Sequence, residues 1–119
     1  MKAIEKLQIA KELLEKQLKS KILDITLNIH LERLKIILMD GTSIFIQYNN
    51  YNEYSYSVIF SNLNLDRIRF DNYDFNWEVD SKPNHYHPRK EKVGKNSPMT
   101  GNPQKDMPVL SEIILLGRF

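Results

Sequence analysis

The sequence contains no cysteine, which excludes disulfides, cysteine nucleophiles and thiolate metal ligands. It has only four glycines, and none of them forms a glycine-rich phosphate-binding loop. No apolar run approaches the roughly 20 residues that cross a bilayer, and the lysine-rich N-terminus does not resemble a signal peptide. We therefore expect a cytoplasmic protein with no membrane partner, in which a zinc site could use only histidine and carboxylate ligands.

The charge of the chain is unevenly distributed. A chain of 119 residues is long enough for one hydrophobic core but not for two, so we predict a single domain over residues 1–119. Its net charge is only +2, yet residues 82–105 carry six Lys or Arg against one acid, Glu91. A basic segment on an otherwise mildly acidic domain favours a polyanionic partner. A solvated loop would tolerate the same composition.

The N-terminal segment has helical periodicity. Over residues 2–20, Leu7, Ala10 and Leu14 recur at the spacing of one helix face, with charged residues on the other. This pattern predicts a helix packed across a sheet. The alternative is that the helix also provides a surface for a partner protein or for a homodimer.

Residues 24–70 alternate with period two and predict an antiparallel meander of four to five strands. Asp40-Gly41 lies between two β-rich runs and predicts a hairpin with a type I′ turn, in which both residues have positive φ. In a strand at 65–70, Arg67 and Arg69 would project from the same side of the sheet. There is no βαβ alternation, which argues against a Rossmann or P-loop fold.

The remaining residues predict a loop and a helix. All five prolines lie between residues 83 and 108, so residues 71–105 are expected to form a basic, site-bearing loop that cannot supply a central strand. A short helix over 107–116 follows, begun by Asp106 and ended by Gly117. The predicted fold class is therefore α+β: an N-terminal helix packed on an antiparallel sheet, a basic loop and a short C-terminal helix.

Ionisable side chains are densest between residues 66 and 95. Metal-independent RNA cleavage needs a base for the 2′-hydroxyl, an acid for the leaving 5′-oxygen and cations for the charged transition state. Histidine suits both proton transfers, and arginine grips phosphate. We predict His85, His87, Arg69 and Asp71 as the catalytic set, with Asp71 as an orienting carboxylate and no cofactor. The predicted nucleic-acid-binding residues are Arg67, Lys82, Arg89, Lys90, Lys92 and Lys95.

Other interpretations of this segment remain open. His85 and His87 could bind a metal together with Asp71, Glu78 or Asp80, although nearby lysines and arginines would repel a divalent cation. They could equally be exposed loop residues without a special role. Three aromatic residues could stack on bases or plug the edge of the core: Tyr73, Phe75 and Trp77.

Two short motifs resemble those of a known family. Arg69-Phe70-Asp71-Asn72, followed by Pro83-x-His85-x-His87, is similar to the pattern of TumE-type toxins of toxin–antitoxin pairs. The Asp40-Gly41 hairpin and the Tyr54-Ser55-Tyr56 strand look similar too, so the resemblance covers about residues 25–90. The sequence departs from the family at Tyr73-Asp74-Phe75 and at Asn84, where the pattern has histidines.

The resemblance implies a small toxin that acts on RNA and is neutralised by a cognate helix-turn-helix antitoxin. Two functions follow as hypotheses. The first is a metal-independent endoribonuclease that uses histidine acid–base catalysis. The alternative is a non-catalytic nucleic-acid- or protein-binding module that uses the basic 82–105 loop.

Overall fold

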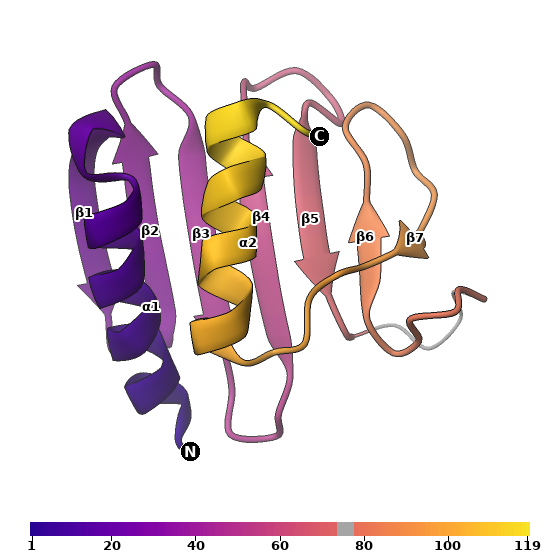
Figure 1. Cartoon of the computed structure of the whole chain (residues 1–119), viewed down its shortest axis with the longest axis horizontal. Helices are drawn as coiled ribbons and strands as arrows, with labels where there is room; N and C mark the ends of the chain where they lie inside the picture. The colour runs from indigo at the N-terminus through magenta and orange to yellow at the C-terminus, as the bar shows by residue number, and fades with distance from the viewer. Residues whose placement is uncertain (74–77) are drawn as a thin grey trace.

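A computed structural model describes residues 1–73 and 78–119. In these residues two α-helices lie on one face of a seven-stranded antiparallel sheet whose strand order follows the sequence (Figure 1). This confirms the α+β class, although the sheet has more strands than the four to five predicted. The elements are α1 (Ala3–Gln17), the 3₁₀ turn η1 (Lys19–Lys21), β1 (Ile22–Asn28), β2 (Arg33–Leu38), β3 (Ser43–Tyr48), β4 (Tyr54–Ile59), β5 (Arg67–Asp71), β6 (His85–His87), β7 (Lys95–Asn96) and α2 (Pro103–Leu116).

Helix α1 packs its periodic apolar face into the core. Leu7, Ala10 and Leu14 are fully buried, as their spacing predicts. The helix begins without a side-chain cap of its own. The backbone N–H of Ala3 instead donates to Asn50 Oδ1 at 2.8 Å, so the turn between β3 and β4 satisfies one of the open donors at the helix start.

The hairpin predicted at Asp40-Gly41 connects β2 and β3. The predicted turn type is wrong, because only Gly41 has a positive φ (91°). Asp40 stabilises the turn in another way: its carboxylate accepts the backbone N–H of Thr42 at 2.9 Å. The loop is therefore longer than a two-residue turn, and the N–H of Leu38 closes it by donating to the carbonyl of Thr42.

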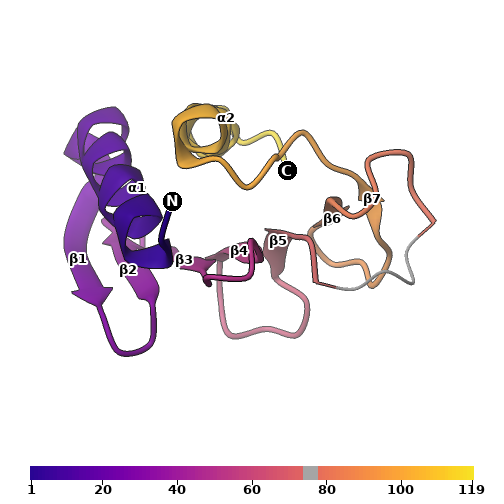
Figure 2. The same ribbon diagram turned by 90° about the horizontal axis from the view of Figure 1, so that it is seen from below.

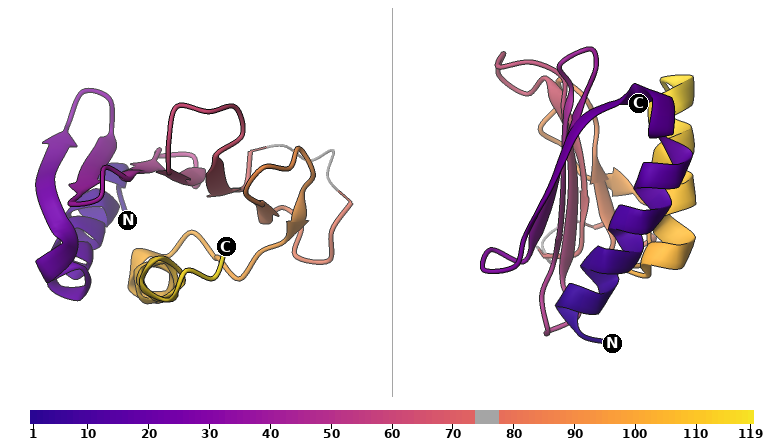
Figure 3. Two further views of the ribbon diagram at one scale, coloured as in Figure 1. Left: turned by 90° about the horizontal axis from the view of Figure 1, so that it is seen from above. Right: turned by 90° about the vertical axis from the view of Figure 1, so that its left-hand side faces the viewer.

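The two faces of the sheet differ in chemistry. Apolar side chains of β2 to β5, such as Ile36, Ile46 and Ile68, are buried beneath the helices. Within the described residues no helix covers the opposite side, which we call the open face (Figure 2; Figure 3). From the register and the alternation of burial, the open face carries Arg33, Lys35, Ile37, Ser43, Phe45, Gln47, Ser55, Ser57, Ile59, Arg67, Arg69, Asp71, His85 and His87.

The predicted 71–105 loop is interrupted by two short strands, which corrects the expectation of an irregular segment. β6 pairs with β5, and β7 pairs with β6 at the edge of the sheet. Pro83 and Pro88 flank β6, and a proline has no N–H for the ladder. The strand is therefore limited to three residues and lies next to the edge rather than in the centre of the sheet.

Helix α2 begins four residues earlier than predicted. Asn102, not Asp106, is the N-cap: its side chain accepts the N–H of Gln104 at 3.0 Å, and Pro103 occupies the first turn. Asp106 is instead buried and accepts hydrogen bonds from Thr100 and Gly101. Gly117 ends the helix in the left-handed conformation, as the sequence predicts.

Candidate functional site

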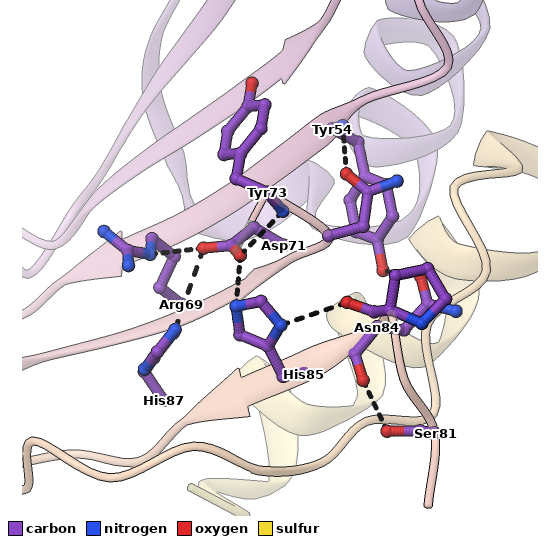
Figure 4. A network of polar contacts seen from close by, with 10 residues as sticks. Tyr54, Arg69, Asp71, Tyr73, Ser81, Asn84, His85 and His87 are labelled. Atoms are coloured by element: carbon purple, nitrogen blue, oxygen red, sulfur yellow. Dashed lines mark hydrogen bonds and ion pairs between the residues drawn. The ribbon is translucent and has the colours of Figure 1, made fainter. Parts of the chain in front are cut away.

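Strands β5 and β6 bring four predicted catalytic side chains together. In their antiparallel register Arg69 lies opposite His87, and Asp71 lies opposite His85. Residues two apart on a strand share a face, so all four side chains point to the open face (Figure 4). The spacing of His85 and His87 therefore places both rings on one face, as expected for an extended segment.

The Asp71 carboxylate is the centre of this cluster. Its Oδ1 lies 2.5 Å from His85 Nε2, and its Oδ2 lies 2.6 Å from Arg69 Nε and 3.9 Å from His87 Nε2. The backbone N–H of Tyr73 also donates to Oδ1 at 3.3 Å. The Asp71 side chain is only 2% exposed, whereas Arg69 is 44% exposed. The cluster thus has a buried anion and one cation that reaches solvent.

His85 is held between two hydrogen-bond acceptors. Its Nδ1 lies 3.0 Å from the carbonyl oxygen of Pro83, and its Nε2 faces the Asp71 carboxylate. A carbonyl and a carboxylate can only accept, so the ring satisfies both when each of its nitrogens carries a hydrogen. His85 is therefore held in place from both sides of its ring.

His87 lies near both charges of the cluster. Burial lowers the pKa of His87 below its usual value, and the nearby positive charge of Arg69 lowers it further, against the opposing effect of Asp71. His87 also forms a hydrogen bond with the backbone of Val93, so the segment after β6 lies against it. The two rings are 4.8 Å apart between centroids and nearly perpendicular. Two neighbouring imidazoles can serve as acid and base.

A second set of hydrogen bonds fixes the approach to β6. Asn84 accepts the Tyr54 hydroxyl through Oδ1 at 2.6 Å, and its carbonyl accepts the Ser81 hydroxyl. Asn72 Oδ1 accepts the N–H of Tyr54 at 3.0 Å. Asn84, which replaces a histidine of the resembled pattern, therefore holds β4 next to the cluster. Sequence reasoning missed Tyr54 and Asn84 in this role, because no local signal pairs residues 30 positions apart.

The cluster also has the composition of a metal site. Ligand atoms of Asp71, His85 and His87 lie within 4.8 Å of one another. Two histidines and one carboxylate are a known ligand set. The guanidinium of Arg69 on the same carboxylate opposes a divalent cation. Glu78 and Asp80, the other proposed ligands, are exposed and are not members of the group that the described residues form.

Comparison of the chain with family models, curated proteins and solved structures gave no match. The resemblance to TumE-type toxins therefore rests on the motif residues alone. Among the described residues, neither helix has the length and apolar character needed to cross a membrane.

The two other arginines predicted to bind nucleic acid have partners within the protein. Arg89 Nε lies 2.5 Å from Asp66 Oδ1, and its guanidinium lies over the rings of Phe60 and Phe119. Arg67 donates to the carbonyl of Pro88 at 3.2 Å. Arg89 in particular fastens the loop after β6 and the C-terminus to the end of β4.

The predicted lysines lie on the surface. Lys82 and Lys95 form long ion pairs with Glu78 and Glu91, at 3.4 and 3.8 Å. Lys90 and Lys92 are exposed. Exposed ion pairs of this kind contribute little to stability, so a polyanion can replace their carboxylates. All four lysine side chains are therefore available to a polyanion.

Of the aromatic residues predicted to stack on bases, Tyr73 is 42% exposed beside the cluster. Its backbone N–H belongs to the Asp71 network, as described above. Phe75 and Trp77 lie outside the described residues. Tyr73 is thus the described aromatic side chain nearest in sequence to Asp71 that a base could contact.

Proposed function

We propose that the chain is a metal-independent endoribonuclease, the toxin of a toxin–antitoxin pair, acting on RNA in the cytoplasm. The observation that carries the proposal is the Asp71 carboxylate, which gathers Arg69, His85 and His87 on one face of the sheet. The toxin assignment rests on the resemblance of the same motifs to TumE-type toxins. It implies a cognate helix-turn-helix antitoxin as a partner.

The geometry supports a definite division of roles. His87, kept neutral by burial, takes the proton of the 2′-hydroxyl while the 2′-oxygen attacks phosphorus. His85 supplies a proton to the 5′-oxygen as the P–O5′ bond breaks. The products are a 2′,3′-cyclic phosphate and a 5′-hydroxyl. Arg69 reaches solvent and stabilises the charge on the phosphate oxygens, and Asp71 orients the other three groups.

RNA cleavage in EDTA tests the proposal. Wild-type protein is incubated with labelled RNA in EDTA, next to His85→Ala, His87→Ala and the control His30→Ala, which changes an exposed histidine in the turn after β1. We expect cleavage by wild type and by the control, and a loss of at least about 100-fold in either site variant. Equal cleavage by all four proteins, or cleavage only after added metal, would contradict the proposal.

A second candidate is a non-catalytic nucleic-acid- or protein-binding module. The observation in its favour is the burial of the two histidine side chains, which are only 1% and 5% exposed. In this candidate the Asp71 cluster is a structural ion-pair network, and the basic 82–105 segment is the contact surface. RNA binding that weakens with rising salt, without cleavage, would favour it.

A further inference from the structure

We propose that the open face is a track for single-stranded RNA, which runs from the Asp71 cluster across β4 and β3 to Arg33 and Lys35 on β2. This inference rests on the proposed function, since it names the path of the substrate to the same site. It differs from the sequence-based expectation, which placed the contact surface on the 82–105 loop. Three features of the molecule support the track: the register of the sheet, the charge of its open face and the side chains around Phe45.

The register aligns the site with a distant basic pair. Reading across the strands, His87 lies opposite Arg69, Arg69 opposite Ser57, Ser57 opposite Phe45, and Phe45 opposite Lys35. Neighbouring strands are about 4.8 Å apart, so Lys35 and Arg69, three strands apart, are about 14 Å from each other. A short extended strand of RNA can contact both with phosphates that are more than one nucleotide apart.

The charge along this path has one sign. The neighbouring row pairs Arg33 with Gln47, Gln47 with Ser55, and Ser55 with Asp71. In the two rows between β2 and β6, Asp71 is the one acid that the described residues contribute, and it is buried against Arg69. The exposed charges of both rows are therefore positive, which suits a phosphate backbone.

Phe45 provides a platform for a base. The guanidinium of Arg33 lies 5.2 Å from the centre of its ring, and the ammonium of Lys35 lies 5.6 Å from it. The aromatic ring attracts both cations and so holds them against the surface of the sheet instead of letting them extend into the solvent. A guanidinium plane in this position can stack on an unpaired base, and single-stranded RNA offers such bases.

The short polar residues between the two ends leave room for the strand. Ser57 projects from β4, between Phe45 on one side and Arg69 on the other, whereas Ser55 is buried. The Ser57 hydroxyl and the amide of Gln47 can donate to and accept from base edges and 2′-hydroxyls. A duplex would present none of its bases to Phe45 or Arg33, so the face suits a single strand.

The test is RNA affinity in a protein that cannot cleave. Binding of a fluorescent single-stranded RNA is measured by anisotropy, over a range of salt, in the His87→Ala background. Arg33→Gln/Lys35→Gln is compared with Lys16→Gln/Lys19→Gln, which removes the same charge from exposed positions at the end of α1 and in η1. We expect about a tenfold loss of affinity for the first pair and a salt dependence reduced by about 1.4 in log–log slope. The control should keep the affinity of its parent.

Each outcome decides between the two proposals. If Arg33→Gln/Lys35→Gln binds RNA with the affinity of its parent, or with that of the control pair, the track is rejected. Cleavage by the wild type would still support the proposed ribonuclease activity. If binding falls as expected but the wild type never cleaves, the track stands and the ribonuclease fails. If the parent does not bind RNA, both proposals are wrong. If it binds poly-glutamate as tightly as RNA, RNA is not the specific ligand of the open face. Circular dichroism checks folding, and Arg33→Ala/Lys35→Ala replaces the first pair if it does not fold.

Discussion

His85 and His87 share a strand and a face, but their surroundings differ. His85 lies between a carboxylate and a backbone carbonyl, both acceptors. His87 lies next to the guanidinium of Arg69 and is farther from Asp71. The division into acid and base that we propose rests on this asymmetry. It also has a consequence for stability that can be measured without any substrate.

Replacing His87 should change the dependence of stability on pH. The pKa of His87 is lowered in the folded protein by burial, from about 6.5 in the unfolded chain. As pH falls below about 6.5, the unfolded chain binds a proton at His87 that the folded chain does not, so the free energy of unfolding decreases. His87→Gln should remove this loss, which is at most about 1.4 kcal/mol per pH unit. Urea unfolding between pH 7.5 and 5 measures it.

The control for this prediction is His30→Gln, at an exposed position. Its stability should follow that of the wild type at every pH. If His87→Gln and wild type lose stability in parallel below pH 6.5, His87 does not have the lowered pKa. The assignment of His87 as the neutral base would then be wrong.

Arg89 is expected to act in stability and not in RNA binding. Its guanidinium bonds to Asp66 and lies over two aromatic rings. The pKa of Asp66 is lowered by Arg89 and by Ser61, so the pair is present at neutral pH. Arg89→Ala should therefore lower Tm by several degrees, while Lys92→Ala, which changes an exposed lysine of the same segment, should not. Thermal unfolding of both variants decides this, and a larger loss of RNA affinity in Arg89→Ala than in Lys92→Ala would argue for a direct contact.

At the level of elements, helix α2 is attached to the sheet through a buried hydrogen-bond chain. The Tyr48 and Tyr56 hydroxyls are 2.9 Å apart, and Tyr56 donates to Asp106 Oδ2 at 2.6 Å. Burial raises the pKa of both tyrosines, so their hydroxyls stay protonated and able to donate. The start of α2 is therefore fixed to the middle of β4.

Tyr56→Phe should destabilise the fold by about 1–3 kcal/mol, because it removes a buried donor and leaves Tyr48 without this partner. Tyr51→Phe is the matched control, since Tyr51 is 84% exposed. Urea denaturation of the two variants provides the comparison. Equal stability of Tyr56→Phe and wild type would show that this hydrogen-bond chain does not anchor α2.

The elements that could be predicted from sequence are those whose signal is local. Alternation over β2 to β5 and the helical spacing of α1 follow directly from which side chains must be buried. β6 and β7 were missed because three and two residues between prolines carry no periodic pattern. The start of α2 was misplaced because Asp106 and Asn102 both stand near a proline. Asp106 is used in tertiary hydrogen bonds that no local pattern reveals.

The candidate site was predictable in its members but not in its arrangement. The His-x-His spacing predicts that both rings share a face. The central place of Asp71 depends on the β5–β6 register, across a connection from residue 72 to 84 that has no sequence signal. The burial of the cluster and the role of Asn84 depend on the same pairing, so the sequence could not predict either.

At the scale of the molecule, the two faces of the sheet differ in composition. Its helix-covered face holds the apolar core, and its open face carries the polar residues (Figure 2). The Asp71 cluster lies near one edge of this face, and the basic pair around Phe45 lies near the other. The substrate track and the reaction centre that we propose would both lie on this face.

The chemical nature of the RNA ends tests the central claim most directly. Products formed by the wild type in EDTA are analysed by mass spectrometry, with His87→Ala as the comparison. Transfer of the 2′-hydroxyl proton to His87 predicts fragments with a 2′,3′-cyclic phosphate and a 5′-hydroxyl, which are lost in the variant. Fragments that carry a 5′-phosphate and form only with a divalent metal, or intact RNA under all conditions, would contradict the account.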